Sequence, residues 1–159
     1  MIRGLKGRSI GAALFTSLVL CAAQVRAQDM LVAETPAGLA IGQLHFEPGQ
    51  EICLTWAHSV TGGKVADCFE NRAGSLVLSR SYLHDFAAGL GEVAGRGTLR
   101  SAPSGGYWIE GIDEAIVNNT LRLRVGAPRV GHVLSDGANR LNLSARAAGA
   151  SIHLRLRPH

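Results

Sequence analysis

The sequence has few cysteines, no long apolar run and no sustained helical pattern. It contains 3 cysteines among 159 residues. Its longest uncharged apolar stretch, residues 10–23, is too short for a membrane span, which needs about 20 residues. No segment keeps an apolar helical stripe over several turns, and no internal repeat or low-complexity tract is present. These absences argue against a membrane-embedded helical protein, a helical bundle and a repeat protein.

The apolar stretch has instead the features of a secretory leader. Basic residues precede it, and residues 25–27 (VRA) place small side chains at both positions that a signal peptidase recognises. The pattern predicts a signal peptide over 1–27 and an exported chain over 28–159. We expect cleavage near Ala27 and a single periplasmic or secreted domain.

The expected mature chain carries no net charge. Of the 16 Lys and Arg residues 4 lie in the leader, whereas all 12 acidic residues follow it, which leaves 12 of each sign. A nucleic-acid-binding domain needs a net basic balance or a clustered basic face. Nucleic acid is therefore not expected as a partner.

Residues 28–159 show the alternation that is typical of β-strands. Large apolar side chains alternate with charged or smaller ones in 52–56, 121–125 and 152–157, which gives each segment one buried and one exposed face. Further strands are expected over 30–35, 39–46, 65–71, 75–83, 107–112, 130–134 and 139–146. The pattern predicts an all-β fold, a single antiparallel β-sandwich or flattened barrel of about nine strands.

A glycine-rich segment interrupts this pattern over residues 87–106. Loops of this length are uncommon in compact domains and are usually functional or mobile. The glycines lack the spacing and the strand-then-helix setting of a phosphate-binding dinucleotide loop. We expect a loop that closes over a ligand or docks on a partner.

Two cysteines remain after the leader, Cys53 and Cys68. An even number in an oxidising compartment favours a disulfide, and the alternative is a pair of buried free thiols. In an antiparallel hairpin with a four-residue loop over 59–62, Cys53 falls opposite Cys68. The same register places Trp56 opposite Val65.

Three short motifs resemble those of a bacterial protein family. They are Trp56-Ala57-His58-Ser59-Val60, Phe86-Ala87-Ala88-Gly89, and Gly131-His132 before Leu134. Their order and spacing are similar to the family catalogued as domain of unknown function 1850, over about residues 50–157. Val65 stands where the family has a further aromatic residue, and Ala87 stands where it has a glycine.

The resemblance implies an envelope protein. Members of this family are small, usually exported proteins, often encoded beside TAXI-type permeases of tripartite periplasmic (TRAP) transporters. An accessory role in solute uptake follows, with a membrane transporter permease or its solute-binding protein as the partner. The resemblance implies no catalytic residues.

The candidate binding corner lies at the end of one predicted strand. It consists of Trp56, His58 and Ser59, with Gly89 of the glycine-rich segment and His132 as expected neighbours. An aromatic wall with a few placed polar groups suits a small molecule or a partner surface, neither of which the sequence identifies. Trp108, in contrast, is expected to pack in the core or at an edge.

Chemistry at this corner is the weaker alternative. His58 and His132 are candidate zinc ligands if Asp67 or Glu70 lies nearby, but no metal-ligand spacing is present. The other interpretation is that each histidine caps a turn or bonds to backbone. Ser59 is adjacent to His58, so the two side chains point to opposite faces of a strand, and no nucleophile-elbow motif is present. No cofactor is predicted.

Two predicted strands carry alternating arginines. They are Arg122, Arg124, Arg155 and Arg157. If the strands are neighbours, the arginines form a basic stripe that suits an acidic protein face or anionic lipid. The alternative is a solvated face whose arginines bond to carboxylates such as Glu110 and Asp113.

The sequence thus favours an exported, non-enzymatic binding or accessory protein of a TRAP-type transport system. Two alternatives stay open. One is a metal- or serine-dependent envelope enzyme that uses His58 and His132, which would require these groups within reach of a carboxylate in a concave pocket. The other is a structural envelope protein without a ligand.

Overall fold

A computed structural model describes residues 28–84 and 95–159 of the chain. The predicted signal peptide, 1–27, and the segment 85–94, which includes Gly89, lie outside the described residues. No helix within the described part is long and apolar enough to cross a membrane.

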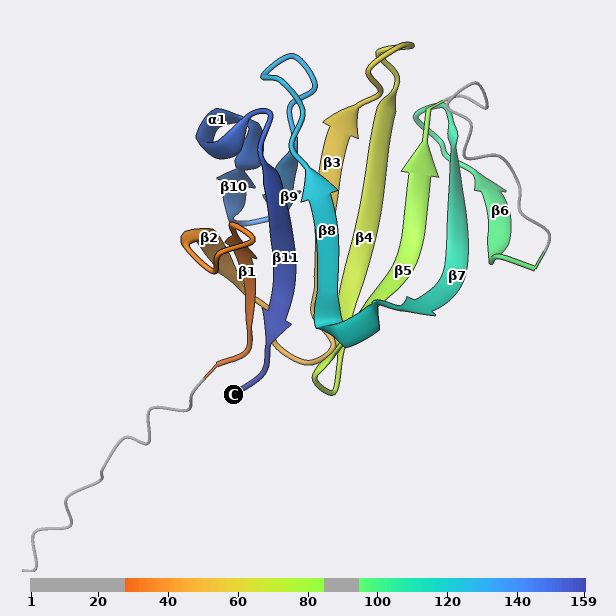
Figure 1. Cartoon of the computed structure of the whole chain (residues 1–159). Coiled ribbons are helices and arrows are strands. Elements are labelled where there is room, and N and C mark those ends of the chain that lie inside the picture. The colour runs from red at the N-terminus through yellow and green to blue at the C-terminus, as the bar shows by residue number, and fades with distance from the viewer. Residues whose placement is uncertain (1–27, 85–94) are drawn as a thin grey trace, which may run out of the picture.

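The fold is a β-sandwich of two antiparallel sheets that do not close into a barrel (Figure 1). The small sheet has the strand order β2-β1-β11-β8 and the large sheet the order β10-β9-β3-β4-β5-β7-β6. The small sheet consists of β1 (Met30–Glu34), β2 (Ala40–His45), β8 (Thr120–Arg124) and β11 (Ser151–Arg157). The large sheet consists of β3 (Glu51–Ala57), β4 (Lys64–Arg72), β5 (Ser75–Leu83), β6 (Thr98–Ser101), β7 (Tyr107–Ala115), β9 (Val133–Ser135) and β10 (Arg140–Asn142). The predicted all-β sandwich is confirmed.

The core lies between the sheets and follows the alternation of the strands. Its largest fully buried side chains include Leu31, Phe46, Ile52, Leu76, Leu134, Ile152 and Leu154. Every second residue of β11 is buried, and the residues between them face outward. Inward side chains of both sheets make the main cluster, and Leu83, Tyr107 and Ile109 form a second, smaller one. The two outer faces remain for function.

Two short segments differ from the expected strands. The expected strand over 139–146 is only β10, because Asn142 caps the helix α1 (Leu143–Ala147) by accepting a hydrogen bond from the Ala145 N–H at 2.9 Å. The glycine-rich segment, in contrast, contains the edge strand β6, all of whose side chains are exposed. Its alternation is weak because no face of β6 is buried.

The β3–β4 hairpin has the predicted register. Cys53 lies opposite Cys68, Trp56 opposite Val65, and the His58 N–H donates to the Gly63 carbonyl at 2.8 Å. The predicted disulfide is present, with Cα atoms 4.0 Å apart. This hairpin positions both the predicted corner and the groove described below, because its successive side chains point to opposite faces.

Candidate binding groove

The predicted corner exists in part, on the inner side of the large sheet. The rings of Trp56 and His132 stack with centroids 5.6 Å apart and planes inclined by 26°. Trp56 packs against the core cluster, and His132 is buried with 7% of its surface exposed. The aromatic wall therefore faces the protein interior.

His132 joins three segments of the chain. Its ring Nδ1 accepts a hydrogen bond from the Gly126 N–H at 2.9 Å, and its backbone N–H donates to Ser144 Oγ at 2.9 Å. The Ser144 hydroxyl in turn donates to the Gly126 carbonyl at 3.0 Å. Burial lowers the pKa of His132, which favours the neutral ring that this acceptor role requires. These bonds assign His132 a structural role.

His58 caps the hairpin turn. Its Nδ1 accepts a hydrogen bond from the Thr61 N–H at 3.3 Å, and the Thr61 hydroxyl lies at the same distance from it. Ser59 and Val60, in the same turn, are exposed, with Val60 at 86%. The turn-capping alternative for His58 thus describes its contacts.

The carboxylates that a zinc site at the histidines would require, Asp67 and Glu70, bond to other groups. Asp67 accepts a hydrogen bond from the Ser81 hydroxyl at 2.6 Å, and burial raises the pKa of its carboxyl group. Glu70 pairs with Arg72 at 2.7 Å. Neither histidine belongs to a group of three potential metal ligands among residues 28–84 and 95–159.

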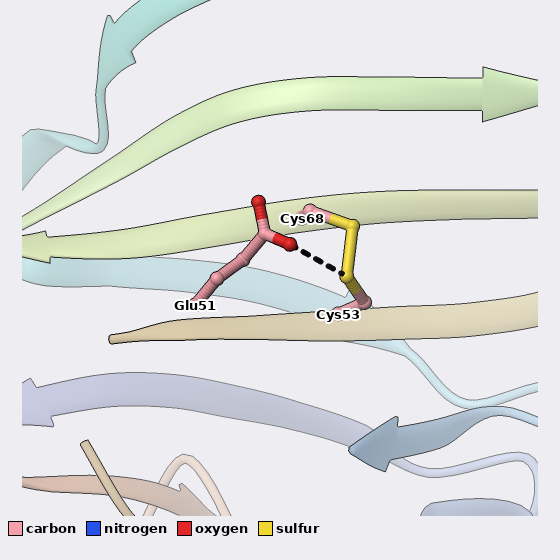
Figure 2. A group of neighbouring side chains, drawn as sticks. All are labelled: Glu51, Cys53 and Cys68. Atoms are coloured by element: carbon pink, nitrogen blue, oxygen red, sulfur yellow. Dashed lines mark hydrogen bonds between the residues drawn. A yellow bond between two sulfur atoms is a disulfide. The ribbon is translucent and has the colours of Figure 1, made fainter. Parts of the chain in front are cut away.

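The one such group in the described chain is Glu51, Cys53 and Cys68 (Figure 2). Its two sulfur atoms are bonded to each other, and Glu51 Oε1 lies 3.7 Å from the Cys53 sulfur. A cysteine binds a metal as its thiolate, and a disulfide offers no thiolate. In the oxidised protein this cluster is a cross-link.

A groove lies on the outer face of the large sheet, opposite the corner. Its main cavity has a volume of about 580 Å³ and is lined by Cys53, Thr55, Gly62, Gly63, Lys64, Ala66, Tyr82, His84, Ser104 and Trp108. A second cavity of about 380 Å³ shares Thr55, Lys64, Ala66 and Tyr82 with it and continues past Trp56 to Gly131 and Arg140. Trp56 packs against the core and also borders this second cavity. The shared residues make the two cavities one continuous groove across β9, β3, β4, β5 and β7.

Aromatic and charged side chains form one wall of this groove. The rings of Tyr82 and Trp108 lie 5.3 Å apart at 54°, and the Arg80 guanidinium lies 4.4 Å from the Trp108 ring centroid. Glu51 receives hydrogen bonds from Arg80 at 2.6 and 3.0 Å, which raise the pKa of the guanidinium. The wall thus presents two tilted aromatic rings, and the charges of Arg80 and Glu51 beside them are paired with each other.

A fixed turn closes the groove beside Trp108. The Tyr82 hydroxyl donates to the Gly105 carbonyl at 2.8 Å, which holds the turn that carries Ser104. Gly106 has φ of 73°, and a Cβ atom there would lie 2.5 Å from the Leu83 carbonyl oxygen. Only glycine fits this close approach, so the rim of the groove is built into the backbone.

Sequence reasoning missed this aromatic wall. Trp108 was expected in the core or at an edge, but it lines the groove and is only partly buried. The alternation of the strands could have revealed it. Trp108 lies on the same face of β7 as Glu110, and Tyr82 lies on the same face of β5 as Arg80. Charged neighbours two residues away predict an outward-facing aromatic side chain.

The four arginines do share one face, on neighbouring strands β8 and β11. The carboxylate that pairs with them is Glu34 of β1, at 3.2 Å from Arg155 and 2.5 Å from Arg157. Glu110 and Asp113, the expected partners, pair with Arg100 and Arg72. The expectation of those two partners was wrong, because β7 belongs to the other sheet.

Comparison with known proteins identifies the family. The family model named Domain of unknown function (DUF1850) matches residues 52–143, more than half of the chain. The chain therefore belongs to this family, and the resemblance found in its motifs is confirmed. No curated protein and no solved structure matches it.

Proposed function

We propose that this member of the DUF1850 family is an exported, non-enzymatic binding protein that serves a TRAP-type transport system. The groove on the outer face of the large sheet is the observation that carries the proposal. Its main cavity of about 580 Å³ lies within the range of ordinary ligand sites. The partner is the transporter permease or its solute-binding protein, as the family resemblance implies.

The composition of the groove supports recognition by contact. Tyr82 and Trp108 provide a large, rigid apolar area, and such side chains dominate the binding energy of many interfaces. Lys64 and Thr55 add polar groups at defined positions on adjacent strands. An aromatic platform with few polar contacts fits a partner segment or a small molecule lying along the sheet.

The arrangement of the histidines favours binding over catalysis. Within the described residues, no serine hydroxyl is hydrogen-bonded to a histidine ring, and no carboxylate orients one. The Thr61 hydroxyl lies near His58 on an exposed turn, where no second group orients the ring. Nucleophilic catalysis requires a base that is itself oriented by a third group.

Affinity capture tests the proposal. The full-length chain with a C-terminal tag, expressed in its native host, is captured from envelope extracts in mild detergent, and co-purifying proteins are quantified by mass spectrometry. We expect enrichment of a TRAP permease subunit or its solute-binding protein, reduced by roughly tenfold in Trp108→Ser. Mass spectrometry of the captured chain also shows whether the leader has been removed.

The matched control is Arg124→Gln, which removes an exposed side chain from the outer face of the other sheet. It should capture the transporter component as the wild type does. Equal capture by Trp108→Ser would rule out the groove as the contact site. Absence of any transporter component from the wild-type capture would overturn the accessory role itself.

A further inference from the structure

The outer face of the small sheet carries surplus positive charge. It presents Arg122 and Arg124 from β8 and Arg155 and Arg157 from β11. Glu34 is the only carboxylate that pairs with any of them among the described residues. Four guanidinium groups and one carboxylate leave three positive charges on this face.

A pocket of about 420 Å³ lies within this face. Val117, Asn118, Thr120, Arg122, His153 and Arg155 line it, so none of its lining residues is acidic. It shares no residue with the groove on the large sheet. Apart from Val117 its lining residues are polar, in contrast to the aromatic wall of the groove, and so suit a different class of ligand.

The strand register brings the cationic groups together. His153 lies directly opposite Arg122, and Arg155 lies directly opposite Thr120. Residues two apart on a strand share a face, so all four side chains surround one point on the sheet. Arg122 has no ion-pair partner among the described residues. Arg155 uses its buried Nε for the ion pair with Glu34, and its terminal guanidinium nitrogens have no hydrogen-bond partner in the described structure. Donors therefore remain available on both arginines.

A held turn forms the end of the pocket. Asn118 and Asn119 both have positive φ, 54° and 51°. Two side-chain hydrogen bonds hold Asn119 in this conformation. Its side chain accepts one from the Leu76 N–H and donates one to the Gly74 carbonyl of the β4–β5 hairpin. The side-chain amide of Asn118 makes no such bond in the described structure and lines the pocket. The turn places Asn118 at the edge of the pocket that Arg122 and Arg155 also line.

We propose that this pocket binds one oxyanion group, a carboxylate or a phosphate, of a small anionic molecule. The planar guanidinium fork of Arg122 matches two oxygen atoms of such a group, and the Arg155, His153 and Asn118 donors complete its surroundings. Hydrogen bonds to a charged group are worth more than those between neutral groups. The inference does not depend on the proposed function of the groove.

Two-dimensional NMR of the isotopically labelled protein tests this inference. Inorganic phosphate and succinate are titrated separately, at constant ionic strength, into the wild type and into Arg122→Gln. We expect saturable shifts confined to residues 117–122 and 152–156 for at least one of the two anions. In Arg122→Gln the dissociation constant should rise by roughly tenfold or more.

Arg124→Gln is the matched control, because Arg124 lies on the same strand face and has no ion pair in the described residues, but does not line the pocket. Its dissociation constant should change by less than about twofold, since only long-range screened charge is lost. An equal rise of the dissociation constant in both variants would mean that the whole basic face attracts the anion without a defined site. It would overturn the proposed binding pocket.

Phosphatidylglycerol vesicles distinguish a lipid headgroup from a free anion. Displacement of pre-bound phosphate or succinate from residues 117–122 by these vesicles would assign the same pocket to a lipid phosphate. Vesicle binding without any shift by the free anions, or no saturable shift at millimolar anion, would overturn the inference.

Discussion

The inner corner and the outer groove are built from the same hairpin, and one step along β3 separates them. Trp56 points inward and stacks on His132, whereas Thr55 points outward and lines the groove. The polar groups of the corner bond to one another and to backbone, as the contacts of His132 with Gly126 and Ser144 illustrate. In the groove, Tyr82 and Trp108 keep partly exposed ring surface.

The difference shows how the same residue types serve the fold on one face and are available for recognition on the other. A buried histidine must have its hydrogen-bond partners within the protein, because burial without them is costly. An aromatic ring on an outer face has no such requirement and can meet another molecule. Substitutions should therefore separate the two regions, with stability affected at the corner and binding at the groove.

The largest expected effect on stability comes from the disulfide in the groove floor. Replacing both cysteines in a Cys53→Ala, Cys68→Ala double variant should lower the free energy of unfolding by about 3 kcal/mol, since the bridge closes a loop of 15 residues. Chemical denaturation of wild type and variant measures the difference. Adding a reductant should destabilise the wild type by a similar amount and leave the variant unchanged.

The cross-link joins only strands β3 and β4 of the large sheet. The double variant therefore also tests whether the face that carries the groove depends on the disulfide. If the oxidised wild type and the double variant unfold at the same denaturant concentration, the bridge does not stabilise the hairpin. The groove would then owe its shape to strand pairing alone.

The two tryptophans provide the direct comparison. Trp56→Leu should lower the free energy of unfolding by about 2 kcal/mol, because Trp56 packs against the core cluster and the His132 ring. Trp108→Leu should cost less than about 1 kcal/mol, mainly through its contact with Arg80. Denaturant unfolding of both variants measures the two values, and equal losses would contradict the assignment of Trp108 to an exposed recognition surface.

The sequence predicted the architecture well where alternation was strong. The strands around Leu121–Val125 and Ile152–Arg157, the register of the hairpin and the bridge between Cys53 and Cys68 all agree with the structure. These features are local, since they depend on a period of two and on one turn. Family membership was also visible in short motifs.

The candidate site was less predictable, because it depends on which strands become neighbours. Trp108 and Tyr82 meet only through the pairing of β5 with β7, and Arg155 meets Glu34 only through the pairing of β11 with β1. Such pairings join residues far apart in the chain, and no single segment encodes them. Motif-bearing residues such as Trp56 and His132 attracted attention, although their contacts are structural.

The pH dependence of stability at His132 sharpens the structural assignment of the corner. Burial lowers the pKa of this histidine in the folded state below its ordinary value of 6.5. Above that pH both states are neutral, and as the pH falls below it the unfolded chain takes up the proton first. The free energy of unfolding should therefore fall from about pH 6.5 downward, by at most about 1.4 kcal/mol per pH unit.

His132→Asn is the variant that isolates this effect. The asparagine Oδ1 can take the place of ring Nδ1 as acceptor for the Gly126 N–H, but it does not titrate. The difference in unfolding free energy between wild type and variant, measured by denaturation from pH 7.5 to 5, should shrink as the pH falls, while the contributions of the other titrating groups cancel. A constant difference across this range would mean that the His132 ring accepts a proton in the folded protein as readily as in water, and the corner would then be open to solvent and available for binding after all.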